Sequence, residues 1–89
     1  MGKGLVAVDY SNGITYIGRP IKNIDESGPG GGGEFWLYEY LVCSTSGLIK
    51  SDMSFCGAVR SFYYKKNGNN KNHGPIRIPA EGRIVHILE

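Results

Sequence analysis

The sequence has few cysteines, no long apolar runs and little net charge, and each of these shortages argues against one class of protein. Its 89 residues include two cysteines, too few for a disulfide-rich scaffold. No apolar run approaches the roughly 18 residues of a transmembrane helix, and Met1–Tyr10 lacks the apolar stretch of a signal peptide. A formal net charge of +2 does not require a nucleic-acid partner. We therefore expect a cytoplasmic protein that makes no membrane contact.

The sequence also lacks a catalytic or metal-binding motif. His73 and His86 stand alone on their segments, and Cys43 and Cys56 are too far apart for the Cys-x-x-Cys spacing of a zinc site. Both cysteines lie in apolar sequence, which favours packed and unreactive thiols over nucleophiles. We expect no catalytic residues, no metal ligands and no cofactor, and hence no enzymatic activity.

Glycine, by contrast, is abundant, with 14 residues concentrated partly in the run GPGGGG. That run matches neither the phosphate-binding loop GxxxxGK[ST] nor a strand–GxGxxG–helix unit, so a flexible connection is the favoured interpretation. A second loop is rich in lysine and asparagine. We expect one domain over residues 1–89, with flexible loops at 19–33 and 65–75.

Asn12-Gly13 gives the clearest local signal in the chain. An Asn-Gly pair flanked by alternating apolar residues is typical of a β-hairpin with a type I′ turn. The predicted strands are Leu5–Tyr10 and Ile14–Ile17. In this register Val8 faces Ile17.

Residues 34–66 contain two segments rich in aromatic and β-branched residues, EFWLYEYLVCS and SFCGAVRSFYYKK. This composition predicts two strands of a long hairpin. In one register Cys43 faces Cys56 and Glu39 faces Arg60, an apolar and an oppositely charged cross-strand pair. A different turn would give another register, and the sequence leaves open whether the two cysteines form a disulfide.

Two short strands, Ile76–Ile78 and Arg83–Leu88, are predicted near the end of the chain, and no segment is assigned helical periodicity. The predicted fold is all-β with little or no helix. It is a small antiparallel β-barrel or sandwich of about six to seven strands, built on two hairpins.

Function is predicted from the aromatic residues. On the predicted long hairpin both faces are apolar, and a chain of this length has little spare mass to cover both. We expect a small non-enzymatic interaction module that binds a protein partner, or itself as a homodimer, through the aromatic face. The alternative is a nucleic-acid-binding β-barrel that uses this face and the 65–75 loop. A third interpretation places the rings in the core. The predicted binding residues are Trp36, Tyr38, Tyr40, Tyr63, Lys65, Lys66 and Lys71.

Overall fold

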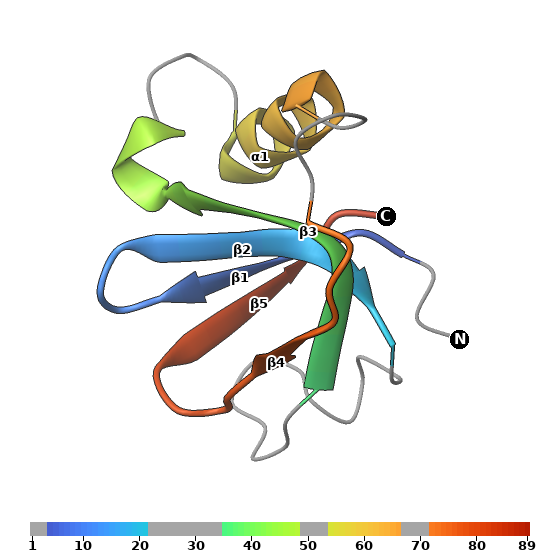
Figure 1. The fold of residues 1–89 in the computed structure, drawn as a ribbon. Coiled ribbons are helices and arrows are strands. Elements are labelled where there is room, and N and C mark those ends of the chain that lie inside the picture. Colours follow the sequence, from blue (N-terminus) through green and yellow to red (C-terminus); the bar gives the residue numbers. More distant parts are fainter. Residues whose placement is uncertain (1–3, 22–34, 49–53, 67–71) are drawn as a thin grey trace.

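A computed structural model describes residues 4–21, 35–48, 54–66 and 72–89. Over these ranges the protein is a single antiparallel five-stranded sheet with one helix (Figure 1). The strand order is β4-β3-β2-β1-β5, and the sheet does not close on itself. A fold dominated by β-structure was predicted and is confirmed, and the described residues form five strands where six to seven were expected. The elements are β1 (Val6–Tyr10), β2 (Ile14–Pro20), β3 (Phe35–Ser44), the 3₁₀ turn η2 (Thr45–Gly47), α1 (Phe55–Lys66), β4 (Ile76–Ile78) and β5 (Arg83–Ile87).

The first hairpin is confirmed, with a register that differs by one residue. Val8 pairs with Tyr16 instead of Ile17. In the turn only Gly13 has a positive φ (87°), so the turn is not type I′, which needs two residues with positive φ. The amide of Gly13 donates to the carbonyl of Tyr10 (3.0 Å), which leaves a three-residue loop between the strands. The additional loop residue shifts the pairing by one position.

The predicted hairpin over 34–66 is wrong in its second half. β3 is a strand as expected, but the following aromatic segment forms α1. Ser54 caps this helix, because its hydroxyl accepts a hydrogen bond from the amide of Gly57 (3.1 Å). Val59 and Tyr63, four residues apart, are both fully buried. Helical spacing of the apolar residues thus prevails over a composition that favours a strand.

The cross-strand pairs predicted for that hairpin are therefore absent. Cys43 lies on β3 and Cys56 on α1, and both are free thiols. Glu39 lies 3.9 Å from the guanidinium of Arg19, while Arg60 donates to the backbone near the end of the chain. The expectation of little or no helix is also wrong, since α1 spans 12 residues.

The sheet carries a buried core on each of its faces, and alternate residues of β1 point into one or the other. α1 covers one face, as Figure 1 shows. We call the cluster under it the helix-covered core: Leu5, Ala7, Ile17, Leu41, Leu48, Val59, Tyr63 and Leu88. The cluster on the opposite face is the curled-sheet core: Val6, Val8, Phe35, Leu37, Ile78 and Val85.

The curled-sheet core owes its cover to a sharp bend in β3 (Figure 1). Pairing between β2 and β3 shifts register after Ile17, and Glu39 adopts a φ of 51°, which non-glycine residues seldom do. Gly18 lies at the same place, where a Cβ would be 2.9 Å from the Cβ of Tyr40. The backbones approach closely there because Gly18 has no side chain. The bend carries β4 to the side of the sheet where Tyr10 donates a hydrogen bond to the carbonyl of Pro79 (2.9 Å).

Candidate functional site

The four aromatic residues predicted to form one binding face are divided between the two sides of the sheet. Trp36 on β3 is 39% exposed, and Tyr38 is partly buried. Tyr40 packs against the curled-sheet core. Tyr63 is fully buried in the helix-covered core, where its hydroxyl donates to the carbonyl of Glu39 (2.8 Å). The core interpretation therefore holds for Tyr63, and the four rings do not form one exposed face.

The predicted lysine contacts are likewise separate from these rings. Lys65 and Lys66 are exposed in the last turn of α1, where their charge suits the negative end of the helix dipole. Lys71 lies outside the described residues, as does most of the predicted 19–33 loop. Arg19 and Pro20, which that loop was to include, belong to β2. Binding by these lysines stays a prediction.

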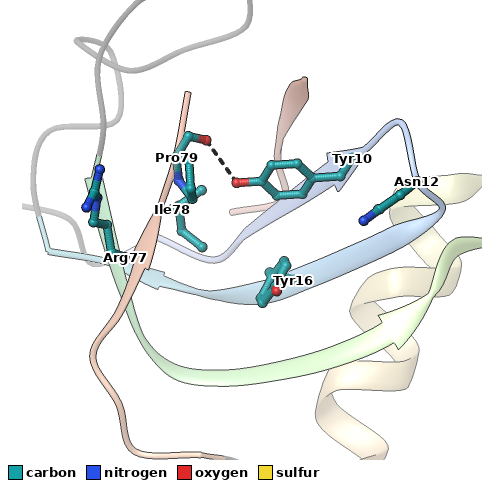
Figure 2. Close-up of a pocket in the computed structure, with 6 residues that line it drawn as sticks. All are labelled: Tyr10, Asn12, Tyr16, Arg77, Ile78 and Pro79. Carbon is teal, nitrogen blue, oxygen red and sulfur yellow. Dashed lines mark hydrogen bonds between the residues drawn. The ribbon is translucent and has the colours of Figure 1, made fainter. Parts of the chain in front are cut away.

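A pocket of about 180 Å³ lies between the turn of the first hairpin and the end of β4 (Figure 2). We call it the tyrosine pocket, because two tyrosines of the hairpin form its aromatic side. The described residues that line it are Tyr10, Asn12, Tyr16, Arg77, Ile78 and Pro79.

The two tyrosines hold a defined geometry. The ring centroids of Tyr10 and Tyr16 are 5.7 Å apart, with the planes at 76°, so the edge of one ring meets the face of the other. The hydrogen bond from Tyr10 to Pro79 spans the pocket wall and ties the hairpin to the segment after β4 (Figure 2). Burial raises the pKa of Tyr10, which therefore remains a protonated donor at neutral pH. The aromatic walls are thus in place before any ligand arrives.

The polar groups of the pocket are mainly donors. The side-chain oxygen of Asn12 accepts a hydrogen bond from the amide of Ile14 (3.1 Å), which leaves its NH₂ group to donate elsewhere. In Figure 2 this nitrogen points toward the space beside the tyrosine rings. Arg77 also lines the pocket, and its guanidinium points away from the two tyrosine rings (Figure 2). None of the described lining residues is acidic.

Comparison with protein-family models, curated proteins and solved structures finds no match for this chain. Only the geometry of the protein itself therefore bears on its function.

A second polar cluster lies under the first turn of α1, around Asp9. One oxygen of its carboxylate accepts hydrogen bonds from the hydroxyls of Thr15 (2.9 Å) and Thr45 (2.7 Å). The other oxygen lies 3.6 Å from Nε2 of His86. Burial, and then the negative charge of Asp9, raises the pKa of Cys43 to about 11, so this thiol is not a nucleophile at neutral pH. The carboxylate therefore joins β1 to β2 and to the 3₁₀ turn η2, which is a structural role.

Two further findings concern metals and membranes. In the ranges that the structure describes, no three His, Cys, Asp or Glu side chains are grouped to hold a metal ion. α1, with 12 residues, is too short to cross a bilayer, and the described ranges contain no other candidate span.

The sequence reasoning missed the tyrosine pocket because its residues come from two distant segments. Tyr10 and Tyr16 were identified only as strand residues beside a turn. Their near-symmetric positions on either side of that turn were a signal that they lie close together. Nothing in the local sequence places Arg77 or Pro79 beside them, because the bend in β3 creates that proximity.

Proposed function

We propose that this chain is a small non-enzymatic interaction module, a half-open barrel that holds a segment of a protein partner in its tyrosine pocket. The observation that carries the proposal is the size of the pocket. Its volume of about 180 Å³ is below the roughly 300–1,000 Å³ typical of small-molecule and cofactor sites. A space of this size suits one or two side chains of a larger partner.

The chemistry of the lining supports binding over catalysis. Tyrosine and arginine are enriched at protein interfaces, where an aromatic ring buries a large area and loses little conformational entropy. The described lining contains no Asp, Glu, His or Cys that could act as a base or nucleophile. The rings are also positioned in advance, which lowers the entropic cost of association.

One residue of the predicted aromatic surface is paired with a residue of the pocket lining. Trp36 pairs with Arg77 across β3 and β4, and its ring is 39% exposed. We include Trp36 in the proposed interface as a flank of the pocket. Self-association through this surface, as a homodimer, is one form that the same interface could take.

Nucleic-acid binding has less support. The prediction required the aromatic face and the lysines to contact the same nucleic acid. Lys65 and Lys66, however, lie on α1, which covers the opposite face of the sheet from the pocket. A ligand in the pocket would therefore not reach both parts of the predicted surface.

A library of random 12-residue peptides displayed on phage, selected on the intact protein, tests the proposal. Enriched peptides should bind the wild type, and Tyr16→Ala should weaken them at least about tenfold, as expected for the loss of an interface anchor. Tyr64→Ala is the matched control, because Tyr64 is a 46% exposed tyrosine on α1, away from the pocket. It should leave binding unchanged.

Two results would overturn the proposal. One is a failure to enrich any peptide. The other is binding that Tyr16→Ala leaves intact while the circular dichroism spectrum shows that the variant is folded. A homodimer would appear in sedimentation as a mass that rises with concentration, and it should be lost in the same variant.

A further inference from the structure

We infer that residues 75–81, which we call the strap, open and close as a unit over the tyrosine pocket and are held closed by the hydrogen bond from Tyr10 to Pro79. The strap contains β4 and contributes three residues to the lining of the pocket, Arg77, Ile78 and Pro79 (Figure 2). The other side of the pocket belongs to the first hairpin. The effect of the strap on a ligand rests on the proposed function, whereas its movement does not.

The chain is anchored to the rest of the sheet on both sides of the strap. Before the strap, Asn72 and Tyr40 exchange two backbone hydrogen bonds of 2.8 Å each. After the strap, the carbonyl of Gly82 accepts a hydrogen bond from the amide of Ser11 (3.2 Å), and β5 begins at the next residue. These anchors confine an opening movement to the strap itself.

Between the anchors, the strap is held by one short ladder and one buried side chain. β4 is an edge strand of the described sheet and pairs with β3 at three positions. Among residues 75–81, all of which the structure describes, only Ile78 is buried. A segment with few buried contacts opens at a lower free-energy cost than the core of a domain. The strap is therefore the part of the pocket that is easiest to displace.

Two side chains from the opposite edge of the curled sheet fasten the strap by its carbonyl groups. The hydroxyl of Tyr10 donates to the carbonyl of Pro79 (2.9 Å), and the guanidinium of Arg83 donates to the carbonyl of Ile78 (3.2 Å). In the described sheet β4 is paired with β3 alone. These side-chain bonds thus take the place of a ladder that would close the sheet, and they can break without disturbing the other strands.

A glycine with a positive φ stands at each end of the strap. Gly74 precedes it and Gly82 follows it, with φ of 66° and 76°. Hinges are often small residues at the ends of a moving element, because these absorb the change in backbone angles. The backbone is least crowded at Gly82, where an added Cβ would lie 3.6 Å from Oγ of Ser11.

Opening of the strap would separate the two walls of the pocket. Tyr10 and Tyr16 would stay in place, because β1 and β2 pair with each other and with further strands. A ligand that contacts both walls binds the closed strap more tightly than the open one, so it shifts the population toward the closed form. The strap is thus the lid of the proposed site, and Tyr10 is a positioning residue whose hydroxyl holds the lid in place.

Two backbone amides of the strap report its opening. The carbonyl of Trp36 accepts a hydrogen bond from the amide of Ile21 (2.9 Å), so this residue directs its backbone groups toward β2. The residues on either side of Trp36 therefore direct theirs toward β4, where they face Ile78 and Ile76. Breakage of this ladder exposes the amides of Ile76 and Ile78 to exchange with solvent.

Native-state hydrogen exchange of the free protein, followed by NMR, tests the movement without a ligand. After correction for intrinsic rates, Ile76 and Ile78 should exchange at least about tenfold faster than the amides in the middle of β1 and β2. Their rates should also depend much less on low concentrations of urea, because a local opening exposes little surface. Exchange at the same rate, and with the same urea dependence, as β1 and β2 would overturn the inference.

Three variants separate local opening from unfolding of the whole domain. Tyr10→Phe keeps the ring and removes the hydrogen bond to Pro79, so strap exchange should accelerate about fivefold. Tyr16→Phe is the matched control, because the hydroxyl of Tyr16 makes no hydrogen bond within the described residues, and it should change nothing. Val59→Ala weakens the helix-covered core, so it should accelerate β1 and β2 at least about tenfold and leave the strap unchanged.

Two results with these variants would contradict the strap. One is an acceleration of Ile76 and Ile78 by Val59→Ala that equals its effect on β1 and β2, since the strap would then open only when the domain unfolds. The other is strap exchange that Tyr10→Phe leaves unchanged. The urea dependence of the wild type decides the same question if Val59→Ala does not fold.

A peptide enriched on the wild type by the library selection tests the role of the strap as a lid. At ten times its Kd, this peptide should slow the exchange of Ile76 and Ile78 about tenfold, because it binds the closed form. Unchanged strap exchange in the complex would show that binding does not require the closed strap, and the lid would be wrong. Failure to enrich any peptide would overturn the proposed function alone, because exchange in the free protein still decides whether the strap opens.

Discussion

In the part of the chain that the structure describes, the two faces of the sheet are closed in different ways, and a pocket lies on one of them. On the helix-covered side, Val59 and Tyr63 of α1 pack against the sheet, and both side chains are fully buried. On the other side, within the described residues, the sheet bends over its own core. There Arg83, only 6% exposed, places its guanidinium 4.9 Å from the centre of the Phe35 ring and donates to the carbonyl of Ile78 (3.2 Å). The candidate binding site occurs at the open end of this second, curled side.

This difference follows from the size of the chain. A domain of 89 residues buries only a little over ~60% of its unfolded surface and cannot provide a separate layer for each face of a sheet. One helix covers one face, and curvature covers the other without additional chain. Among the described residues, curvature leaves a pocket at one end of the sheet, whereas the helix packs over the opposite face. The sequence analysis expected a partner to cover a whole aromatic face. The structure instead offers a smaller candidate site, the tyrosine pocket.

The largest effect is expected on the helix-covered side, from Tyr63→Ala. Removing a fully buried aromatic ring should cost about 3–5 kcal/mol of unfolding free energy, a large share of the total for a domain of this size. Tyr63→Phe keeps the ring and removes only the hydrogen bond to Glu39, so it should cost about 1 kcal/mol. Urea denaturation followed by tryptophan fluorescence measures both.

Tyr16→Ala on the curled side is the comparison for that change. Tyr16 is partly exposed at the pocket, so its removal should cost clearly less stability than Tyr63→Ala while it weakens peptide binding. Equal losses of stability at the two positions would show that Tyr16 and Tyr63 are equally buried, and would contradict the proposed difference between the two faces.

A smaller effect is expected from Arg83→Lys, which tests how the curled side is held. Lysine keeps the charge but loses the planar guanidinium over Phe35 and its fixed donor geometry toward Ile78. We expect a loss of about 1–2 kcal/mol, from a weakened cation–π contact and one charge-assisted hydrogen bond. Arg60→Lys is the control, because exposed Arg60 also donates to a backbone carbonyl but lies on α1. It should change stability by less than about 0.5 kcal/mol, and a similar loss in both variants would argue against a special role for Arg83.

Much of the curled side could be predicted from local sequence. The Asn-Gly turn correctly indicated the first hairpin, and the short apolar runs near the end correctly indicated β4 and β5. Only the turn type and the one-residue register were wrong, because a local pattern does not distinguish a two-residue from a three-residue loop.

The prediction missed α1 because the aromatic and β-branched composition of this segment favours a strand, whereas the spacing of its apolar residues favours a helix. Phe55, Val59 and Phe62 follow a helical i, i+4, i+7 pattern, and Ser54 stands directly before them as a cap. The same residue types also suit strands, and the choice of a strand removed the helix from the prediction.

The pocket could not be predicted in the same way. It depends on the bend of β3, where Glu39 takes a positive φ and Gly18 permits a close backbone approach. Neither residue signals such a bend locally, since glutamate rarely adopts this conformation and a glycine within a strand has several uses. Tertiary packing determines this geometry.

The smallest effect is expected at Glu89, which ties the end of the chain to the helix-covered side. Its carboxylate accepts hydrogen bonds from the hydroxyl of Tyr64 and from the guanidinium of Arg19 (3.4 Å). These bonds, that of Tyr64 foremost, lower the pKa of Glu89 below its usual value. A carboxyl group whose pKa is lowered by folding stabilises the fold above its unfolded pKa, about 4.3, and the stabilisation is lost as pH falls through the folded pKa. Glu89→Gln should therefore lower the melting temperature slightly at pH 7, and the difference from wild type should vanish in acid. Glu81→Gln, at an exposed turn position beyond β4, is the control and should show no such pH-dependent difference. A Glu89 effect that grows in acid, or that Glu81→Gln reproduces, would contradict the assigned contact.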